Sequence, residues 1–234
     1  MICKLDHRKA VAAQRRQRMH QRLVEAAILV VAARGPNETA IDHVVREAGV
    51  SRGTFYKYFT GVEDLLLEAK LRLGAELLEL VLACETPVED PAEALAQSML
   101  RFFATFARYP LIGEFAARTG LNPLNDDTST MKVLHQTVPP MLAAGIEAGR
   151  FVDMPVPVAF DFLRSGVVMS FRRRLAGMPS DGAETTAAVL RLLGVPAAEA
   201  LAFSRMQVAP LEAPEDSLIH RAEMIRAERR AAPR

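Results

Sequence analysis

The sequence is poor in cysteine and has no long apolar run, and both features limit the classes of protein to which it can belong. Its two cysteines, Cys3 and Cys84, have no paired spacing and no histidine set nearby, which argues against a zinc or redox motif. A reducing, intracellular setting is the simpler expectation. The amino terminus carries charge where a signal peptide needs an apolar core, and no run approaches the roughly 18 apolar residues of a membrane span. We therefore expect a soluble, cytoplasmic protein with no membrane partner.

The chain also lacks the short motifs of common catalytic sites. No Walker loop, GxGxxG, GxSxG or HExxH string occurs. The five histidines are scattered without ligand or triad spacing: His7, His20, His43, His135 and His220. We therefore expect no enzyme, no catalytic residue, no cofactor and no metal. Strand-like alternation is absent as well, and nearly every segment past residue 59 has helical periodicity, which predicts an all-α fold.

Charge of the two signs is distributed unevenly, although the formal net charge is only +1. Residues 1–60 hold 11 Lys and Arg against 5 Asp and Glu, and the remainder holds 18 against 23. The front is therefore +6 and the rest −5. This asymmetry fits a phosphate-binding module joined to one that does not bind DNA. Basic termini are also common on soluble proteins, so charge alone leaves nucleic-acid binding open.

Two short helical segments separated by a glycine turn occupy residues 39–59. Apolar residues of the first recur at a 3.6-residue period, and Thr39 with Asp42 three residues later predicts a capping-box-like start. Gly49 can take the positive φ at which a helix stops, and Ser51 can cap the second segment through its hydroxyl. The pattern therefore predicts two helices that meet at a sharp angle.

The second segment is predicted to be anchored by Phe55 and Phe59, which lie four residues apart and face inward. Its first turn then points into the major groove, where Arg52 reaches base edges, preferably guanine, and Gly53 lets the backbone come close. The predicted DNA-binding set also contains Thr39, Ser51, Thr54, Tyr56, Lys57 and Tyr58, of which the last four are expected to hold phosphates. Two alternatives stay open, with Ser51 acting only as a cap and Tyr56 being a core aromatic.

The run AGVSRGTFYKYF at residues 48–59, with EDLL at residues 63–66 and an amphipathic helix that ends in Gly35, resembles the DNA-binding domain of TetR-family transcriptional regulators. The resemblance covers Gln21 to Lys70. The sequence departs from the family at Val62, where many members have a lysine that contacts a phosphate.

The resemblance implies a three-helix helix-turn-helix head and a larger helical domain that binds ligand and dimerises. We expect four parts: a basic arm over residues 1–20, the DNA-binding domain over 21–67, the effector-binding and dimerisation domain over 68–208, and a charged tail over 209–234. The arm is either a phosphate-contacting extension or a solvated continuation of the first helix, and the tail is either a frayed helix or disordered. Segments 156–176 and 183–193 are expected to form a four-helix bundle between subunits. A proline pair at residues 139 and 140 predicts an interrupted or bent helix.

Aromatic and methionine side chains at helical spacing are candidates to line an apolar effector cavity. The predicted set is Met99, Phe102, Phe103, Phe106, Phe115, Met131, Met141, Phe160 and Arg164. Each apolar member is equally explained as ordinary core. Arg164 needs an anionic partner, which is either Asp161 three residues earlier or a ligand carboxylate.

The function implied by the resemblance is that of a ligand-responsive repressor. As a homodimer it would bind a near-palindromic double-stranded operator and leave it when a small, apolar effector binds. A ligand-dependent activator or corepressor of the same fold is the alternative. An architectural DNA binder without a ligand is disfavoured, because compaction alone needs no long helical body.

Overall fold

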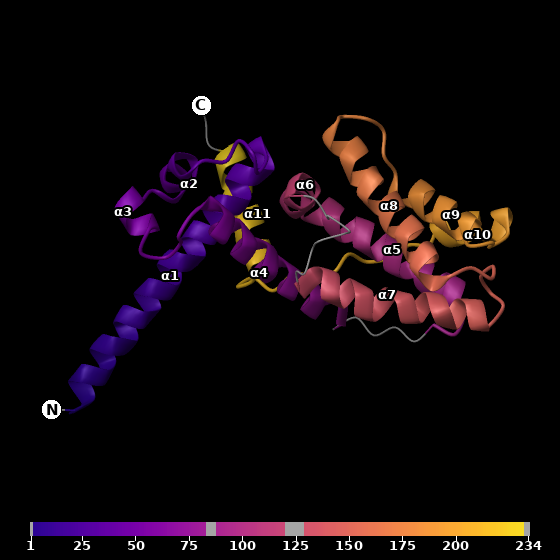
Figure 1. The fold of residues 1–234 in the computed structure, drawn as a ribbon, viewed down its shortest axis with the longest axis horizontal. Coiled ribbons are helices and arrows are strands. Elements are labelled where there is room, and N and C mark those ends of the chain that lie inside the picture. Colours follow the sequence, from indigo (N-terminus) through magenta and orange to yellow (C-terminus); the bar gives the residue numbers. More distant parts are fainter. Residues whose placement is uncertain (1, 83–87, 120–128, 232–234) are drawn as a thin grey trace.

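The computed structural model describes residues 2–82, 88–119 and 129–231, and within these ranges the protein is helical, with no β-strand. The predicted all-α class is confirmed. Figure 1 shows α1, α2 and α3 at one end of the molecule and the larger helical body at the other. The helices of the described ranges are α1 (Ile2–Arg34), α2 (Ile41–Ala48), α3 (Arg52–Phe55), α4 (Val62–Leu82), α5 (Pro91–Arg108), α6 (Pro110–Thr119), α7 (Ser129–Glu147), α8 (Val156–Leu175), α9 (Gly182–Leu192), α10 (Ala197–Ser204) and α11 (Leu218–Ala231).

Helix α1 runs without a break from Ile2 to Arg34, so residues 2–20 continue the first helix. Of the two alternatives for the amino-terminal arm, the structure therefore contains the helical continuation of the first helix. This part projects away from the rest of the molecule, as Figure 1 shows, and residues 12–18 are exposed. The buried half of α1 begins at Leu23 and packs against α2, α4 and α6. α1 thus connects the predicted DNA-binding head, formed by α1 to α3, with the body.

Helix α4 connects the head to the body, because it packs against α1 at one side and α7 at the other. The body is built from α5 to α10, with α5 packed against α6, α7, α9 and α10, and α8 against α6, α7 and α9. Pro139 and Pro140 lie inside α7, which is helical through both residues, so the predicted interruption is absent. The carbonyl groups four residues before each proline belong to His135 and Gln136, which are exposed and open to water. No described helix is both long and apolar enough to cross a bilayer.

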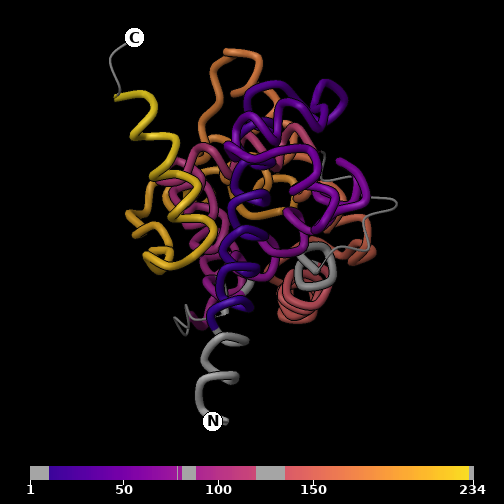
Figure 2. The backbone as a smooth tube through the Cα atoms, turned by 90° about the vertical axis from the view of Figure 1, so that its left-hand side faces the viewer, coloured from indigo at the N-terminus to yellow at the C-terminus, as the bar shows by residue number. Residues whose placement is uncertain are grey.

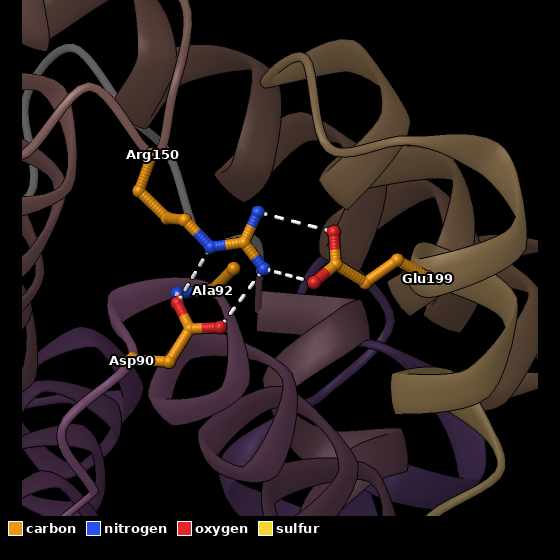
Figure 3. Close-up of polar contacts among 4 residues, drawn as sticks. All are labelled: Asp90, Ala92, Arg150 and Glu199. Carbon is orange, nitrogen blue, oxygen red and sulfur yellow. Dashed lines mark hydrogen bonds and ion pairs between the residues drawn. The ribbon is translucent and has the colours of Figure 1, made fainter.

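Arg150, just after α7, holds three parts of the body together (Figure 3). Its Nε and Nη2 atoms each donate to a carboxylate oxygen of Asp90 at 2.8 Å, and its Nη1 donates to Glu199 of α10 at 3.1 Å. Asp90 also accepts from the N–H of Ala92 at 2.9 Å and so caps α5. Hydrogen bonds from Arg150 hold the pKa of the Asp90 carboxyl below its usual value. The guanidinium of Arg150 therefore links the end of α7 to the start of α5 and to α10.

The segment after α10 returns to the head, where α11 packs against α1, α4 and α6. Figure 2 shows this helix in yellow beside the indigo part of α1. Leu218, Ile219 and Ala222 are buried in that contact. The described part of the tail is therefore a docked helix, and the expectation of a frayed or disordered tail is wrong for residues 218–231.

Candidate nucleic-acid interface and effector-binding region

A sharp turn separates α2 from α3, and its residues explain its shape. Val44, Val45 and Ala48 are buried, as the 3.6-residue period predicts. Gly49 has a left-handed φ of 62°, and its N–H donates to carbonyls in the last turn of α2. A Cβ at this position would lie 2.8 Å from the Nη2 atom of Arg22, which is the movable end of a long side chain, so it is the backbone conformation that favours glycine. The predicted helix stop is confirmed.

The predicted capping box at the start of α2 is wrong. The helix begins at Ile41, and Thr39 lies before it with its hydroxyl donating to the carbonyl of Gly35 at 2.7 Å. The N–H of Ala40 donates instead to Nδ1 of His43 at 3.2 Å. Thr39 is buried and secures the loop between α1 and α2, and its predicted DNA contact stays a prediction.

Helix α3 is a single turn of four residues, shorter than the sequence predicts. Ser51 caps it by accepting from the N–H of Thr54 at 3.1 Å. Beyond the helix, the N–H of Phe59 donates to the carbonyl of Phe55 at 3.1 Å and continues the turn. Phe55 and Phe59 are 0% and 4% exposed, with ring centroids 5.9 Å apart. The two inward anchors are confirmed.

The outward side of this turn carries most of the other predicted DNA-binding residues. Arg52, Gly53 and Lys57 are exposed, and Tyr56 is 58% exposed, so Tyr56 is not a core aromatic. A Cβ at Gly53 would meet nothing closer than the Ser51 hydroxyl at 3.8 Å. No contact within the described residues therefore requires a glycine at this position.

Thr54 and Tyr58 are half-buried at the edge of this surface. The Tyr58 ring lies 6.2 Å from the ring of His20, which packs on Phe59 at 4.9 Å. Burial lowers the pKa of His20, which favours its neutral form. His20 therefore packs against the aromatic side chains at the inner side of the turn.

Arg52 already has an acidic partner in the structure. Its Nε and Nη2 atoms donate to the two carboxylate oxygens of Asp42, both at 2.5 Å, while both side chains stay largely exposed. Hydrogen bonds from Arg52 hold the pKa of Asp42 below its usual value. Sequence reasoning assigns Asp42 to a cap and misses this pair. The guanidinium that is predicted to read a base is thus held across the turn by the helix that precedes it.

Residues 23–69 match the family model described as bacterial regulatory proteins, tetR family. Residues 23–69 therefore belong to the amino-terminal domain of the TetR family. The matched residues contain the α2–α3 turn and all of the predicted DNA-binding positions.

Curated relatives match the amino-terminal part of the chain. The HTH-type transcriptional regulator SrpR of Pseudomonas putida is 35% identical over 80 residues, or 34% of this chain and 37% of that protein. The uncharacterized HTH-type transcriptional regulator TtgW, also of Pseudomonas putida, is 35% identical over 80 residues, or 34% of this chain and 59% of that protein. The match thus spans less than two thirds of either relative.

Solved structures share the fold over more of the chain. RolR without ligand is 25% identical, with a TM-score of 0.58, and the match covers 82% of this chain and 99% of that one. FadR from Bacillus subtilis, in complex with stearoyl-CoA, is 19% identical, with a TM-score of 0.58, and the match covers 74% and 96%. At that identity the second likeness shows the fold alone.

Most predicted effector residues of the body are packed against one another. The rings of Phe102 and Phe106 lie 4.5 Å apart, and both pack on Phe171, at 5.9 Å and 4.9 Å. Phe106, Met99 and Phe115 are buried. Phe171 belongs to the same cluster, and sequence reasoning misses it although it follows Val167 at helical spacing. Met141 is half-buried, and the side chain of Met131 lies outside the described residues.

Phe160 and Arg164 lie on α8 beside α7. The Phe160 ring is buried 4.9 Å from the ring of His135 and 5.9 Å from the Arg164 guanidinium. Arg164 Nη2 donates to Asp161 at 2.9 Å, although the Arg164 side chain is only 10% exposed and that of Asp161 is 64% exposed. In the structure, the anionic partner of Arg164 is therefore Asp161, which lies on the same helix. Its Nε, also buried, has no hydrogen-bond partner among the described residues.

An open pocket of about 540 Å³ lies between α5, α8, α9 and the residues after α10. Of the predicted effector residues, Phe103 alone is among its lining residues. The Phe103 and Phe171 rings lie 5.9 Å apart. Arg174, Arg205 and Asp181 also line it. The pocket therefore combines aromatic side chains with two cations and one carboxylate. Across the described residues, no cluster of three or more metal-ligating side chains occurs.

Helices α8 and α9 expose large apolar side chains on the outside of the body. Phe162 and Met169 are more than half exposed, and Val158 precedes Phe162 by one helical turn, so the three form a stripe along α8. The exposed Leu192 ends α9. An apolar stripe of this kind is typical of a protein–protein contact.

Proposed function

We propose that this TetR-family chain is a ligand-responsive repressor that binds a near-palindromic operator as a homodimer. The observation that carries the proposal is the turn from Ser51 to Phe59, in which both phenylalanines are buried while Arg52, Gly53 and Tyr56 stay exposed. A rigid turn with a guanidinium and a glycine at its outer side suits insertion into a major groove. A ligand-dependent activator or corepressor would use the same surface and differ only in the sign of the response.

The homodimer follows from the small size of the head. One four-residue helix offers few base contacts, so selectivity needs two heads at a fixed spacing. The exposed apolar stripe of Val158, Phe162 and Met169 supports this proposal, because it would suit a two-fold contact with a second copy. Burial of these side chains would remove apolar surface from water and stabilise the assembly.

The effector is a small, largely apolar molecule, and the pocket beside Phe103 and Phe171 is the site that suits it. Arg174 and Arg205 would pair with an anionic group on such a molecule. RolR and FadR, which share the fold, are solved with resorcinol and with stearoyl-CoA, respectively. A coupling of ~1–3 kcal/mol between effector and operator would change operator affinity roughly 5–150-fold.

The DNA-binding proposal is tested by selecting duplexes from a random pool with the purified chain. Arg52→Ala should weaken binding to the selected duplex roughly 5–150-fold and weaken random duplex much less, because a base contact carries the sequence preference. The matched control is Arg172→Ala, an exposed arginine of the body that should leave both affinities unchanged. An equal loss on both duplexes, no preference in the selection, or a monomer in sedimentation at micromolar concentration would contradict the proposal.

The effector proposal is tested by thermal shift with aromatic carboxylates and their neutral amides. The carboxylates should raise the melting temperature as their concentration exceeds Kd, and they should release the selected duplex. Arg174→Ala should abolish both effects. A panel in which acids and amides act alike, or in which Arg174→Ala responds as the parent does, would exclude this pocket.

A further inference from the structure

The carboxyl-terminal segment is tied to α5 before it reaches the head. The N–H of Leu211 donates to the hydroxyl of Thr105 at 2.9 Å, and the N–H of Ala213 donates to the hydroxyl of Tyr109 at 3.0 Å. Both acceptors are 3% exposed. The Tyr109 hydroxyl donates in turn to Glu212 at 3.3 Å. The segment thus satisfies two buried hydroxyl groups of the body and is fixed in place by them.

Helix α11 then contacts the head and the connecting helix. Glu76 of α4 accepts from the N–H groups of Leu218 and Ile219, at 2.7 and 3.0 Å, and so caps the start of α11. Further along, Arg221 donates to Glu25 of α1 at 2.7 Å. In the last turn, Arg229 pairs with Glu47 of α2. Two cations of α11 therefore reach the two helices that position the recognition turn.

The same helix also contacts the body, through the residues between those two arginines. Arg226 donates to Glu114 of α6 at 2.7 Å. Glu223 accepts from the N–H of Leu111 at 2.9 Å and so covers the start of α6. Burial raises the pKa of the Glu223 carboxyl, which agrees with its enclosed position. One helix thus holds α1 and α2 on one side and α6 on the other.

We propose that α11 is a brace that fixes the orientation of the DNA-binding head relative to α6. A head that rotates against the body must break the Arg221 and Arg229 pairs or the Arg226 pair, because a single rigid helix carries all three. The brace thereby limits the range of head positions that the free protein samples. Its consequence for operator affinity depends on the proposed function, but the mechanical coupling itself does not.

Hydrogen–deuterium exchange on the full-length chain tests the coupling without DNA or effector. Arg226→Ala breaks a contact to the body alone, and Arg221→Ala with Arg229→Ala breaks contacts to the head alone. Both variants should speed amide exchange in residues 41–59 by at least about threefold while α8 exchanges as in the parent. The control is Arg230→Ala, an exposed arginine in the last turn of α11. Circular dichroism checks that each variant keeps its helix content.

Exchanging the charges of the Arg226–Glu114 pair provides a second test, which remains informative if a single substitution alters the fold. Arg226→Glu combined with Glu114→Arg should restore the slow exchange that Arg226→Ala loses, because the pair re-forms in reverse. The brace is refuted if Arg226→Ala leaves the exchange of residues 41–59 unchanged, since α11 would then belong to the head alone. It is equally refuted if Arg230→Ala has the same effect as Arg226→Ala. Neither result would bear on whether the head binds DNA.

Discussion

Asp90 has two separable roles, and replacing it by Asn or Ala measures each. Asn keeps a side-chain oxygen that caps α5 at Ala92 but lacks the charge that pairs with Arg150. Ala removes both. The side chains of Asp90 and Arg150 are 30% and 24% exposed, so their pair is partly screened by water. The free energies of unfolding of the two variants should therefore differ only by the contribution of the helix cap.

The expected magnitudes follow from these contacts. An N-cap replaced by Ala costs about 1 kcal/mol. The two Arg150 hydrogen bonds are charge-assisted, but partial exposure and the remaining pair with Glu199 reduce their joint contribution to about 1–2 kcal/mol. Asp90→Asn should thus lower the free energy of unfolding by about 1–2 kcal/mol, and Asp90→Ala by about 2–3 kcal/mol. For a chain of this length each kcal/mol corresponds to roughly 2–4 °C in melting temperature.

Urea denaturation followed by circular dichroism measures both values, with Asp153→Asn, an exposed aspartate, as the control. The pKa of Asp90 is lowered in the folded state, so its stabilising contribution is present above the ordinary Asp pKa of about 4. That contribution is lost as pH falls through the lowered folded value. The gap between parent and Asp90→Asn should therefore close below about pH 4. Equal stability of the parent and Asp90→Asn at pH 7 would refute the reasoning about the ion pair.

Three further predictions concern the DNA-binding surface. Asp42→Asn frees Arg52 and removes a negative charge near phosphates, so gel-shift titration should show tighter binding to the selected duplex; weaker binding would mean that Asp42 orients Arg52 for its base. Tyr56→Phe should weaken binding to selected and random duplexes by the same factor if the hydroxyl serves a phosphate, and a sequence-selective loss would count against that role. Val62→Lys should strengthen binding to all duplexes and steepen the salt dependence by about one phosphate contact, and an unchanged slope would show that position 62 lies away from the backbone.

The recognition turn can be predicted from sequence because its determinants are local. Gly49, Ser51, Phe55 and Phe59 act through backbone conformation, one hydroxyl and a four-residue spacing, all of which are visible within a dozen residues. The start of α2 is mispredicted because Thr39 has two hydrogen-bonding choices. Its hydroxyl bonds backward to Gly35 and not forward into the helix.

The effector-binding residues of the body could be predicted from sequence only in part. The spacing of its aromatic residues correctly indicates one face of a helix, but spacing does not distinguish a packed cluster from a cavity lining. Phe106 faces Phe171 of another helix, and Phe103 lines the open pocket from the same helix. Which of two neighbours meets a void depends on how α5, α8 and α9 approach one another, and no local pattern encodes that geometry.

The tail is mispredicted for a related reason. Its mixture of Glu and Arg resembles a solvated or disordered segment when the partners are unknown, and those partners lie far away in sequence. Arg221 and Arg229 are satisfied by Glu25 and Glu47, on the first two helices. The cost of ordering the tail is offset by those pairs together with the buried Leu218 and Ile219.

The ion pairs with α11 also change the effective charge of the head. Of the 5 acidic residues in residues 1–60, Glu25 and Glu47 are paired with arginines of α11, and Asp42 is paired with Arg52. Helix α11 carries four arginines against two glutamates, so it adds two net positive charges beside a head that is already basic. Since phosphate attraction depends on the summed field of the assembled surface, we expect α11 to strengthen the attraction of the head for DNA. The net charge of +1 for the whole chain conceals this arrangement, because the acidic excess lies in the body.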